Sequence, residues 1–134
     1  MPEVAALITD ILDTHHRHLY EHMPRLDEAF RDAPEALARP WAGLVAVLED
    51  HLAREEEVLF PAMLAQAEGG PAGDLQPVIA AMLAEHDVIR GFERALRGVS
   101  SLAGPHEAEL LALLDDLAVH AEREDTQLFP LGAA

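Results

Sequence analysis

One eleven-residue pattern occurs twice in this chain of 134 residues, and it limits the possible folds more than any other feature. The pattern is H-x-x-x-E-[ED]-x-x-L-F-P, and its copies begin at His51 and His120, 69 residues apart. His16 and His86 extend the period, because the four histidines are separated by 35, 35 and 34 residues. Such a period is typical of a duplicated unit. We therefore predict a duplicated helical hairpin, with one single-histidine helix and one His-x-x-x-Glu helix in each half.

The residues between the breakers favour helix throughout. Leu, Ala, Glu and Arg are abundant, aromatic residues make up only 4% of the chain, and no segment has the pattern of a strand. Long helices with short connections favour an all-α, up-down-up-down four-helix bundle. A single domain over residues 1–134 is expected, with helices at about 4–31, 41–66, 75–102 and 105–129.

Prolines and glycines define the connections between these helices. Residues 32–40 are expected to form a turn, and residues 69–74 form the clearest loop. Asp74 is expected to cap the third helix, with Pro77 in its first turn. The two Leu-Phe-Pro triplets are expected to fill the core and to break the helices.

Composition and charge exclude several classes of function. The net charge is -16, from 25 acids and 9 bases, which repels phosphate backbones and anionic lipid, so we expect neither nucleic acid nor membrane as a partner. Without cysteine, the chain has no thiolate metal site, iron–sulfur cluster or disulfide. It also lacks an apolar run of roughly 20 residues and a leader-like N-terminus, which predicts a soluble, cytoplasmic protein.

Each predicted helix carries an apolar stripe that ionisable residues interrupt. In the second helix, His51 and Glu55 are in phase with Leu44, Leu48 and Leu59. The other three helices show the same substitution of polar for apolar residues. The residues that point toward the core in this way are His16, His51, Glu55, His86, His120 and Glu124.

This pattern predicts a metal site in the core. A His and a Glu four residues apart lie on one helix face with their Cβ atoms about 5–6 Å apart, close enough to bind one cation or neighbouring cations. Imidazole together with carboxylate suits iron, manganese or zinc, and a carboxylate can bridge two metals. Six ligands shared between two metals leave positions open for a small molecule. A buried carboxylate without a partner would be very costly, so the ions and the ligands explain each other.

The chain resembles the hemerythrin-like, or HHE cation-binding, family of non-haem di-iron four-helix bundles. The most specific parts are the two motifs that run into Leu-Phe-Pro and the Glu85-His86-Asp87 segment. The segments 14–18 (THHRH) and 23–26 (MPRL) are similar to the first helix of di-iron proteins implicated in iron–sulfur cluster repair. The resemblance covers nearly the whole chain. It implies terminal iron ligands at His16, His51, His86 and His120, and bridging carboxylates at Glu55 and Glu124.

The resemblance implies a function in the chemistry of small ligands. Binding of O2, nitric oxide or peroxide at an open iron position is expected, in sensing, storage or stress response. The chain shows no counterpart of the cysteine-bearing segment of the cluster-repair proteins, and its third helix offers only His86 where the oxygen carriers use more histidines. The alternatives are a di-iron enzyme for peroxide removal, nitric oxide reduction or iron oxidation, and a metal-free helical interaction domain. Zinc or manganese could replace iron.

Other residues near the motifs allow more than one interpretation. His15 could replace or join His16, which we favour because it lies on the stripe. His18 and His22 could bind metal together but are expected to be exposed, and His106 is expected to start a helix. Two acidic residues and a tyrosine near the motifs also have two possible roles each. Glu56 and Asp125 could bond ligand imidazoles or be solvated, and Tyr20 could line the open position or pack ordinarily.

Overall fold

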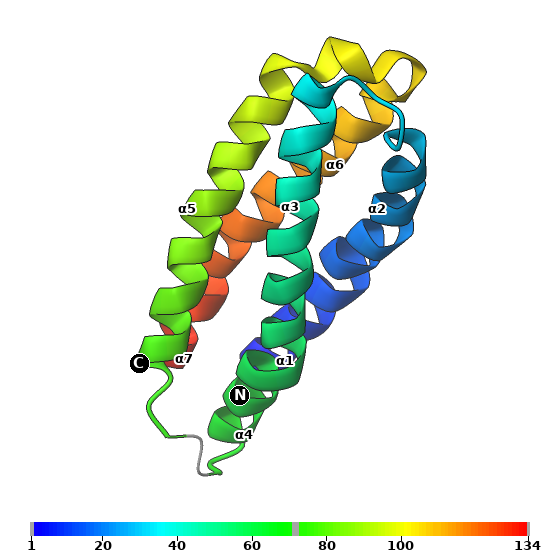
Figure 1. Cartoon of the computed structure of the whole chain (residues 1–134). Helices are drawn as coiled ribbons and strands as arrows, with labels where there is room; N and C mark the ends of the chain where they lie inside the picture. Colours follow the sequence, from blue (N-terminus) through cyan, green and yellow to red (C-terminus); the bar gives the residue numbers. More distant parts are fainter. Residues whose placement is uncertain (1, 71–72, 134) are drawn as a thin grey trace.

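The computed structural model describes residues 2–70 and 73–133, and over these ranges it contains helices and no strand. None of the described helices is long and apolar enough to cross a membrane. In the described residues, four helical rods follow one another along the chain (Figure 1). A rod is an α-helix together with any π-helical turn, η1, η2 or η4, that continues it. The rods consist of α1 (Pro2–Asp10), η1 (Ile11–His16) and α2 (Arg17–Ala29); α3 (Glu35–Arg54), η2 (Glu55–Leu59) and α4 (Phe60–Ala67); α5 (Gln76–Gly98); and α6 (Glu107–Arg123), η4 (Glu124–Leu128) and α7 (Phe129–Ala133).

Successive rods run in opposite directions. Figure 1 shows both chain ends and the connection between α4 and α5 at one end of the bundle, and the other two connections at the opposite end. α3 packs along α5, and α2 packs along α6. The prediction of an all-α, up-down-up-down four-helix bundle is therefore confirmed.

The second helix begins six residues earlier than expected, at Glu35 instead of about Trp41. Pro34 lies at its N-terminal boundary, whereas Pro40 lies inside α3, so the expected turn at Pro40 is wrong. A proline inside a helix removes one backbone hydrogen bond. Leu37 and Trp41, which are 0% and 3% exposed, hold this part of the helix against the core on both sides of Pro40. Their packing outweighs the lost hydrogen bond.

The third and fourth helices are separated by a longer connection than expected. α5 ends at Gly98, four residues early, and α6 begins at Glu107, two residues late. The 3₁₀ segment η3 (Ser100–His106) lies between them and is interrupted at Gly104, whose φ of 56° is left-handed. That conformation suits glycine and cannot continue an α-helix. His106 directly precedes α6, which confirms its expected place at a helix start.

The connection between α4 and α5 includes Pro71 and Ala72, which lie outside the described residues. Beyond them, Oδ1 of Asp74 accepts a hydrogen bond from the backbone N–H of Gln76 at 3.0 Å. Asp74 therefore satisfies an amide at the start of α5, but the N-cap residue is Leu75 and not, as expected, Asp74. Pro77 lies in the first turn of α5, where its missing N–H costs nothing.

A π-helical turn ends at the leucine of each Leu-Phe-Pro triplet. The backbone N–H of Phe60 donates to the carbonyl of Glu55, and that of Phe129 donates to the carbonyl of Glu124, each across five residues. Pro61 follows directly, and the ring of a proline clashes with the carbonyl four residues before it, which explains the wider turn. Because the helix continues through both prolines, the prediction that the triplets break it is wrong. The expectation that they fill the core is confirmed by the buried side chains Leu59, Phe60, Leu128 and Phe129.

A layer of ionisable side chains divides the apolar core into two clusters. The cluster toward the chain ends includes Ile11, Leu59, Met82 and Leu128. The cluster toward the opposite end includes Leu19, Leu48, Ile89 and Leu117. Along each rod, the histidine of the repeat lies between a residue of one cluster and a residue of the other. The in-phase ionisable residues therefore occupy the middle of the bundle.

Candidate metal centre

All six side chains singled out by the repeat converge at this middle layer. They are His16 at the end of η1, His51 in α3, Glu55 at the start of η2, His86 in α5, His120 in α6 and Glu124 at the start of η4. Each is at most 1% exposed. The repeat places them at the same height on four neighbouring rods, so residues far apart in the sequence meet in the core.

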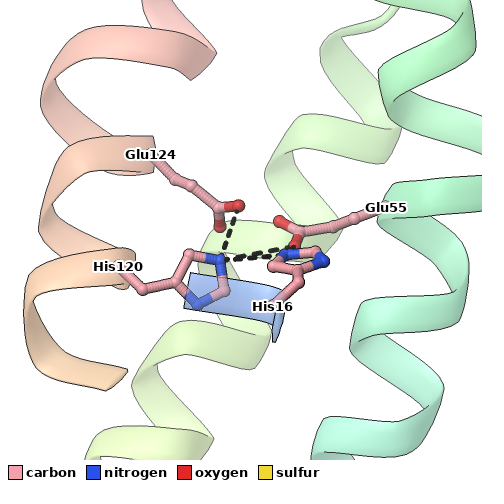
Figure 2. Close-up of side chains that lie close together, drawn as sticks. All are labelled: His16, Glu55, His120 and Glu124. Atoms are coloured by element: carbon pink, nitrogen blue, oxygen red, sulfur yellow. Dashed lines mark hydrogen bonds and ion pairs between the residues drawn. The ribbon is translucent and has the colours of Figure 1, made fainter. Parts of the chain in front are cut away.

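The first of two four-residue groups, which we call the His16 cluster, consists of His16, Glu55, His120 and Glu124 (Figure 2). Nε2 of His16 lies 3.2 Å from Nε2 of His120 and 3.1 Å from Oε1 of Glu55. Nε2 of His120 lies 2.9 Å from Oε2 of Glu124. Figure 2 shows the four side chains pointing toward one another, so their donor atoms face a common point.

The second group, the His51 cluster, consists of His51, Glu55, His86 and Glu124. Nε2 of His51 lies 3.2 Å from Nε2 of His86 and 3.3 Å from Oε2 of Glu55. Nε2 of His86 lies 3.0 Å from Oε1 of Glu124. In each cluster the donor atoms all lie within 4.8 Å of one another.

The two clusters share both carboxylates, and each carboxylate divides its oxygens between them. Glu55 presents Oε1 to the His16 cluster and Oε2 to the His51 cluster. Glu124 presents Oε2 to the His16 cluster and Oε1 to the His51 cluster. This is the arrangement that bridging between two neighbouring cations requires.

Three of the four cluster histidines are bonded through Nδ1 to a carboxylate outside the clusters. The pairs are His16 with Glu56 at 2.7 Å, His51 with Glu85 at 2.8 Å, and His86 with Asp125 at 2.7 Å. An Nδ1–H that is donated outward leaves the Nε2 lone pair facing the cluster, which is the tautomer that binds a metal. Of the two interpretations given for Glu56 and Asp125, the structure supports the hydrogen bond to an imidazole. Sequence reasoning missed Glu85, whose only signal was its place next to His86.

The buried carboxylates create a strong demand for positive charge. Burial alone lowers the pKa of His51, but Glu124 and Glu55 outweigh it and raise the pKa to about 10. Burial likewise lowers the pKa of His120, and the same two carboxylates raise it to about 10. Burial raises the pKa of Glu55, yet His120, His16 and His51 hold it well below its ordinary value. The layer therefore stabilises cations, either protons on imidazoles or metal ions that compete for the same lone pairs.

The distances fit a metal ion in each cluster, and two unbonded oxygens of the His51 cluster fit one as well. Donors that lie about 2.1 Å from one ion at right angles to each other are about 3.0 Å apart. The shortest contacts of the clusters, from 2.9 to 3.3 Å, match this separation. Oε2 of Glu55 and Oε1 of Glu124 are buried and lack a hydrogen-bond partner among the described residues, although each lies near an imidazole. A cation between them would satisfy these oxygens.

His15 lies outside both clusters although it is only 3% exposed. Its Nδ1 donates to Asp116 at 2.8 Å, and its Nε2 accepts from Arg123 at 3.2 Å. Its ring stacks on that of His120, with centroids 5.5 Å apart and planes inclined by 10°. Burial lowers the pKa of His15 despite the nearby Asp116. This geometry supports the choice of His16 over His15 as the cluster residue.

The remaining histidines of the first rod, His18 and His22, are partly covered by α6. His22 is half-buried, with Nδ1 2.9 Å from Oε2 of Glu109, and His18 is half-buried, with Nδ1 3.6 Å from Oδ2 of Asp116. The expectation that both are exposed is therefore wrong. The physical reason is that α2 packs along α6, where acidic side chains draw the imidazoles inward.

Tyr20 lies at the surface and does not line the clusters, since 51% of it is exposed. Its hydroxyl donates to Oε2 of Glu56 at 2.6 Å, and the same oxygen accepts from His16. Tyr20 therefore reaches the His16 cluster through Glu56 and through an edge-on contact with the ring of His16, with centroids 6.5 Å apart.

The comparison with protein families agrees with this geometry. A family described as the hemerythrin HHE cation binding domain matches residues 7–132, nearly the whole chain. Neither the curated proteins nor the solved structures compared with the chain give a significant match. Four antiparallel helical rods, buried His and Glu side chains and the family match agree with one another. The chain therefore belongs to the hemerythrin HHE cation-binding family.

Proposed function

We propose that this chain holds two iron ions, one in each cluster, and binds O2, nitric oxide or peroxide at an open iron position. One observation carries the proposal: each cluster has two imidazole nitrogens and one oxygen from each of Glu55 and Glu124. Four protein donors per ion leave about two positions of a six-coordinate ion for water or a small ligand. Sensing, storage and the response to oxidative or nitrosative stress are the roles that suit such a centre.

Apolar and aromatic side chains on both sides of the layer support a small, weakly polar ligand. The ring of Phe60 lies 5.7 Å from that of His16, and the ring of Phe129 lies 5.7 Å from that of His86. The two apolar clusters enclose the layer toward both ends of the bundle. Such surroundings restrict water and control the ligands that reach a metal.

The roles of the chain's own residues follow from their contacts. Iron, when bound, supplies redox chemistry and binding of a small ligand. Glu56, Glu85 and Asp125 hold the imidazoles of His16, His51 and His86 in one tautomer and one orientation. The net charge of -16 gives no support for a nucleic-acid or membrane partner.

Metal content and absorption test the proposal directly. Protein made in iron-replete cells is expected to hold about two irons per chain. Its near-ultraviolet and visible absorption is expected to change when the reduced protein meets O2 or nitric oxide, and to return when the ligand is removed. Sustained turnover of peroxide, nitric oxide or ferrous iron would instead indicate the enzyme alternative. Bound zinc or manganese would preserve the two-metal centre and change its ion.

A pair of variants separates the centre from adventitious binding. Glu55→Gln removes one charged bridge from both clusters and is expected to lower the iron content to about one per chain or less. Glu57→Gln is the matched control, because Glu57 lies two residues away on the exposed side of the same turn. Full iron content in Glu55→Gln, or no metal in the unmodified chain, would contradict the proposal.

A further inference from the structure

The two halves of the chain repeat each other's contacts around the clusters. Glu56 bonds Nδ1 of His16 at 2.7 Å, and 69 residues later Asp125 bonds Nδ1 of His86 at 2.7 Å. Each half therefore supports the histidine of its first helix with the acid that follows its bridging glutamate. This contact is the same in both clusters.

The contact to Nδ1 of the other two histidines, His51 and His120, differs between the halves. His51 donates through Nδ1 to Glu85 at 2.8 Å, and Glu85 in turn pairs with Arg54. The repeat relates His51 to His120, Glu85 to His15, and Arg54 to Arg123. Arg123 contacts His15 as Arg54 contacts Glu85, so the positions correspond in space as well as in sequence. At the position of Glu85, the first half therefore has a histidine in place of the acid.

His15 cannot do for His120 what Glu85 does for His51. The rings of His15 and His120 are stacked at 10°, and an N–H bond lies in the plane of its own ring, so it does not point at a ring stacked above. Nδ1 of His120 is buried and has no hydrogen-bond partner among the described residues. Both nitrogens of His15 are already occupied, by Asp116 and Arg123.

A carboxylate on the outer nitrogen makes an imidazole a more basic and better oriented ligand, and its removal typically lowers metal affinity by about 10–100-fold. We propose that the two metal positions are unequal, and that the Glu85/His15 difference makes the His51 cluster the tighter one. At limiting metal the chain holds one ion, in the His51 cluster. The inference rests on the proposed two-metal centre and adds which position fills first.

Titration of the full metal-free chain with Co²⁺ tests this order. Co²⁺ binds imidazole and carboxylate, and its visible absorption reports each binding step independently of any activity. Two steps are expected, with affinities that differ by about 10–100-fold. His86→Ala is expected to remove the tighter step, and His16→Ala the weaker one.

Substitutions at Glu85 and His15 test whether these two residues cause the difference in metal affinity. Glu85→Gln is expected to weaken the tighter step by about 10-fold or more, because a neutral amide replaces the carboxylate on His51. His15→Glu is expected to strengthen the weaker step, with Arg123 placed to pair with the new carboxylate. Since Asp116 lies beside His15 and could oppose a second acid, His15→Gln provides a neutral acceptor with the same direction of change. Asp87→Asn is the matched control, because Asp87 adjoins His86 but, among the described residues, pairs only with Arg90.

The outcomes separate the two proposals. Two Co²⁺ ions bound with equal affinity, or unequal steps that neither Glu85→Gln nor the His15 variants alter, would overturn the inequality and leave the two-metal centre standing. Failure to bind any Co²⁺ would overturn both. Unequal steps that respond as expected, with Asp87→Asn unchanged, would establish the inference.

Discussion

Among the described residues, Glu93 is the buried carboxyl that belongs to neither the His16 cluster nor the His51 cluster. It lies in α5, is 7% exposed, and its Oε1 has no hydrogen-bond partner in this part of the chain. Burial raises its pKa above the ordinary value of 4.5. The folded chain therefore keeps this proton to a higher pH than the unfolded chain does. Stability is lost as the pH rises from about 4.5 through the raised pKa.

Replacement of this carboxyl by an amide is expected to stabilise the protein. Glu93→Gln should raise the free energy of unfolding at pH 7 by about 1 kcal/mol, because the ionised form no longer has to be buried. The gain should shrink as the pH falls toward about 4.5, where the carboxyl is increasingly protonated in both states. Urea unfolding at several pH values measures both effects. Glu122→Gln, an exposed change in the same surface groove, should alter neither, and a gain that does not depend on pH would contradict the explanation.

The sequence was more informative about the residues of the two metal clusters than about the carboxylates that bond Nδ1 of their histidines. The phase of His51 and Glu55 within one helix could be read directly, because it depends only on helical geometry. The contact of His51 with Glu85 depends on the height at which α3 and α5 pair, which a single sequence does not reveal. Glu56 and Asp125 were predictable as candidates because each adjoins a bridging glutamate. The stacking of His15 on His120 had no sequence signal at all.

At the scale of helices, α3 and α5 pack closely where Gly43 faces Phe92. A Cβ atom at position 43 would lie 2.4 Å from Cε1 of Phe92, a distance that real side chains do not adopt. The absence of a side chain is therefore what allows the two helices to keep their present separation with this ring between them. Gly91, in α5, has no atom within 4 Å of the corresponding position.

These two glycines provide a matched pair of substitutions. Gly43→Ala is expected to lower the free energy of unfolding by about 1 kcal/mol, because the ring of Phe92 must move. Gly91→Ala is expected to raise it by about 0.5 kcal/mol, since alanine favours helix and meets no neighbour. Chemical unfolding of both variants measures the difference. Equal stability of the two variants would show that the contact with Phe92 does not limit the packing.

Helix ends were less predictable than helix existence. The four apolar stripes depend on periodicity alone, and each lies on a helix of the structure. Pro40 was expected to end a helix, but burial of Leu37 and Trp41 outweighs its missing hydrogen bond. The π-helical turns before Pro61 and Pro130 also depend on a balance between proline geometry and core packing that local sequence rules do not include.

At the scale of the whole molecule, every rod passes through the layer of His and Glu side chains. Each rod contributes at least one residue to a cluster, and Glu55 and Glu124 belong to both. Ions in the two clusters would therefore be held only by the folded chain, because the unfolded chain does not bring these residues together. A ligand of this kind stabilises the folded state by mass action.

Metal loading is accordingly expected to shift unfolding strongly. Free metal at about 100 times the dissociation constant should raise the free energy of unfolding by about 2.7 kcal/mol for each occupied cluster. Thermal or urea unfolding with and without a strong chelator measures the shift. Glu57→Gln should show the same shift, whereas Glu55→Gln should show much less. An unfolding midpoint that chelation leaves unchanged would contradict the expectation.

The division of the core into two apolar halves determines how the bundle responds to a disturbance. A substitution near either end of the bundle changes contacts within one apolar half, whereas a change of charge in the middle layer touches side chains from all four rods. Ions bound in this middle layer would connect all four rods at the level where the two apolar halves meet, so their loss would loosen the contact between the halves.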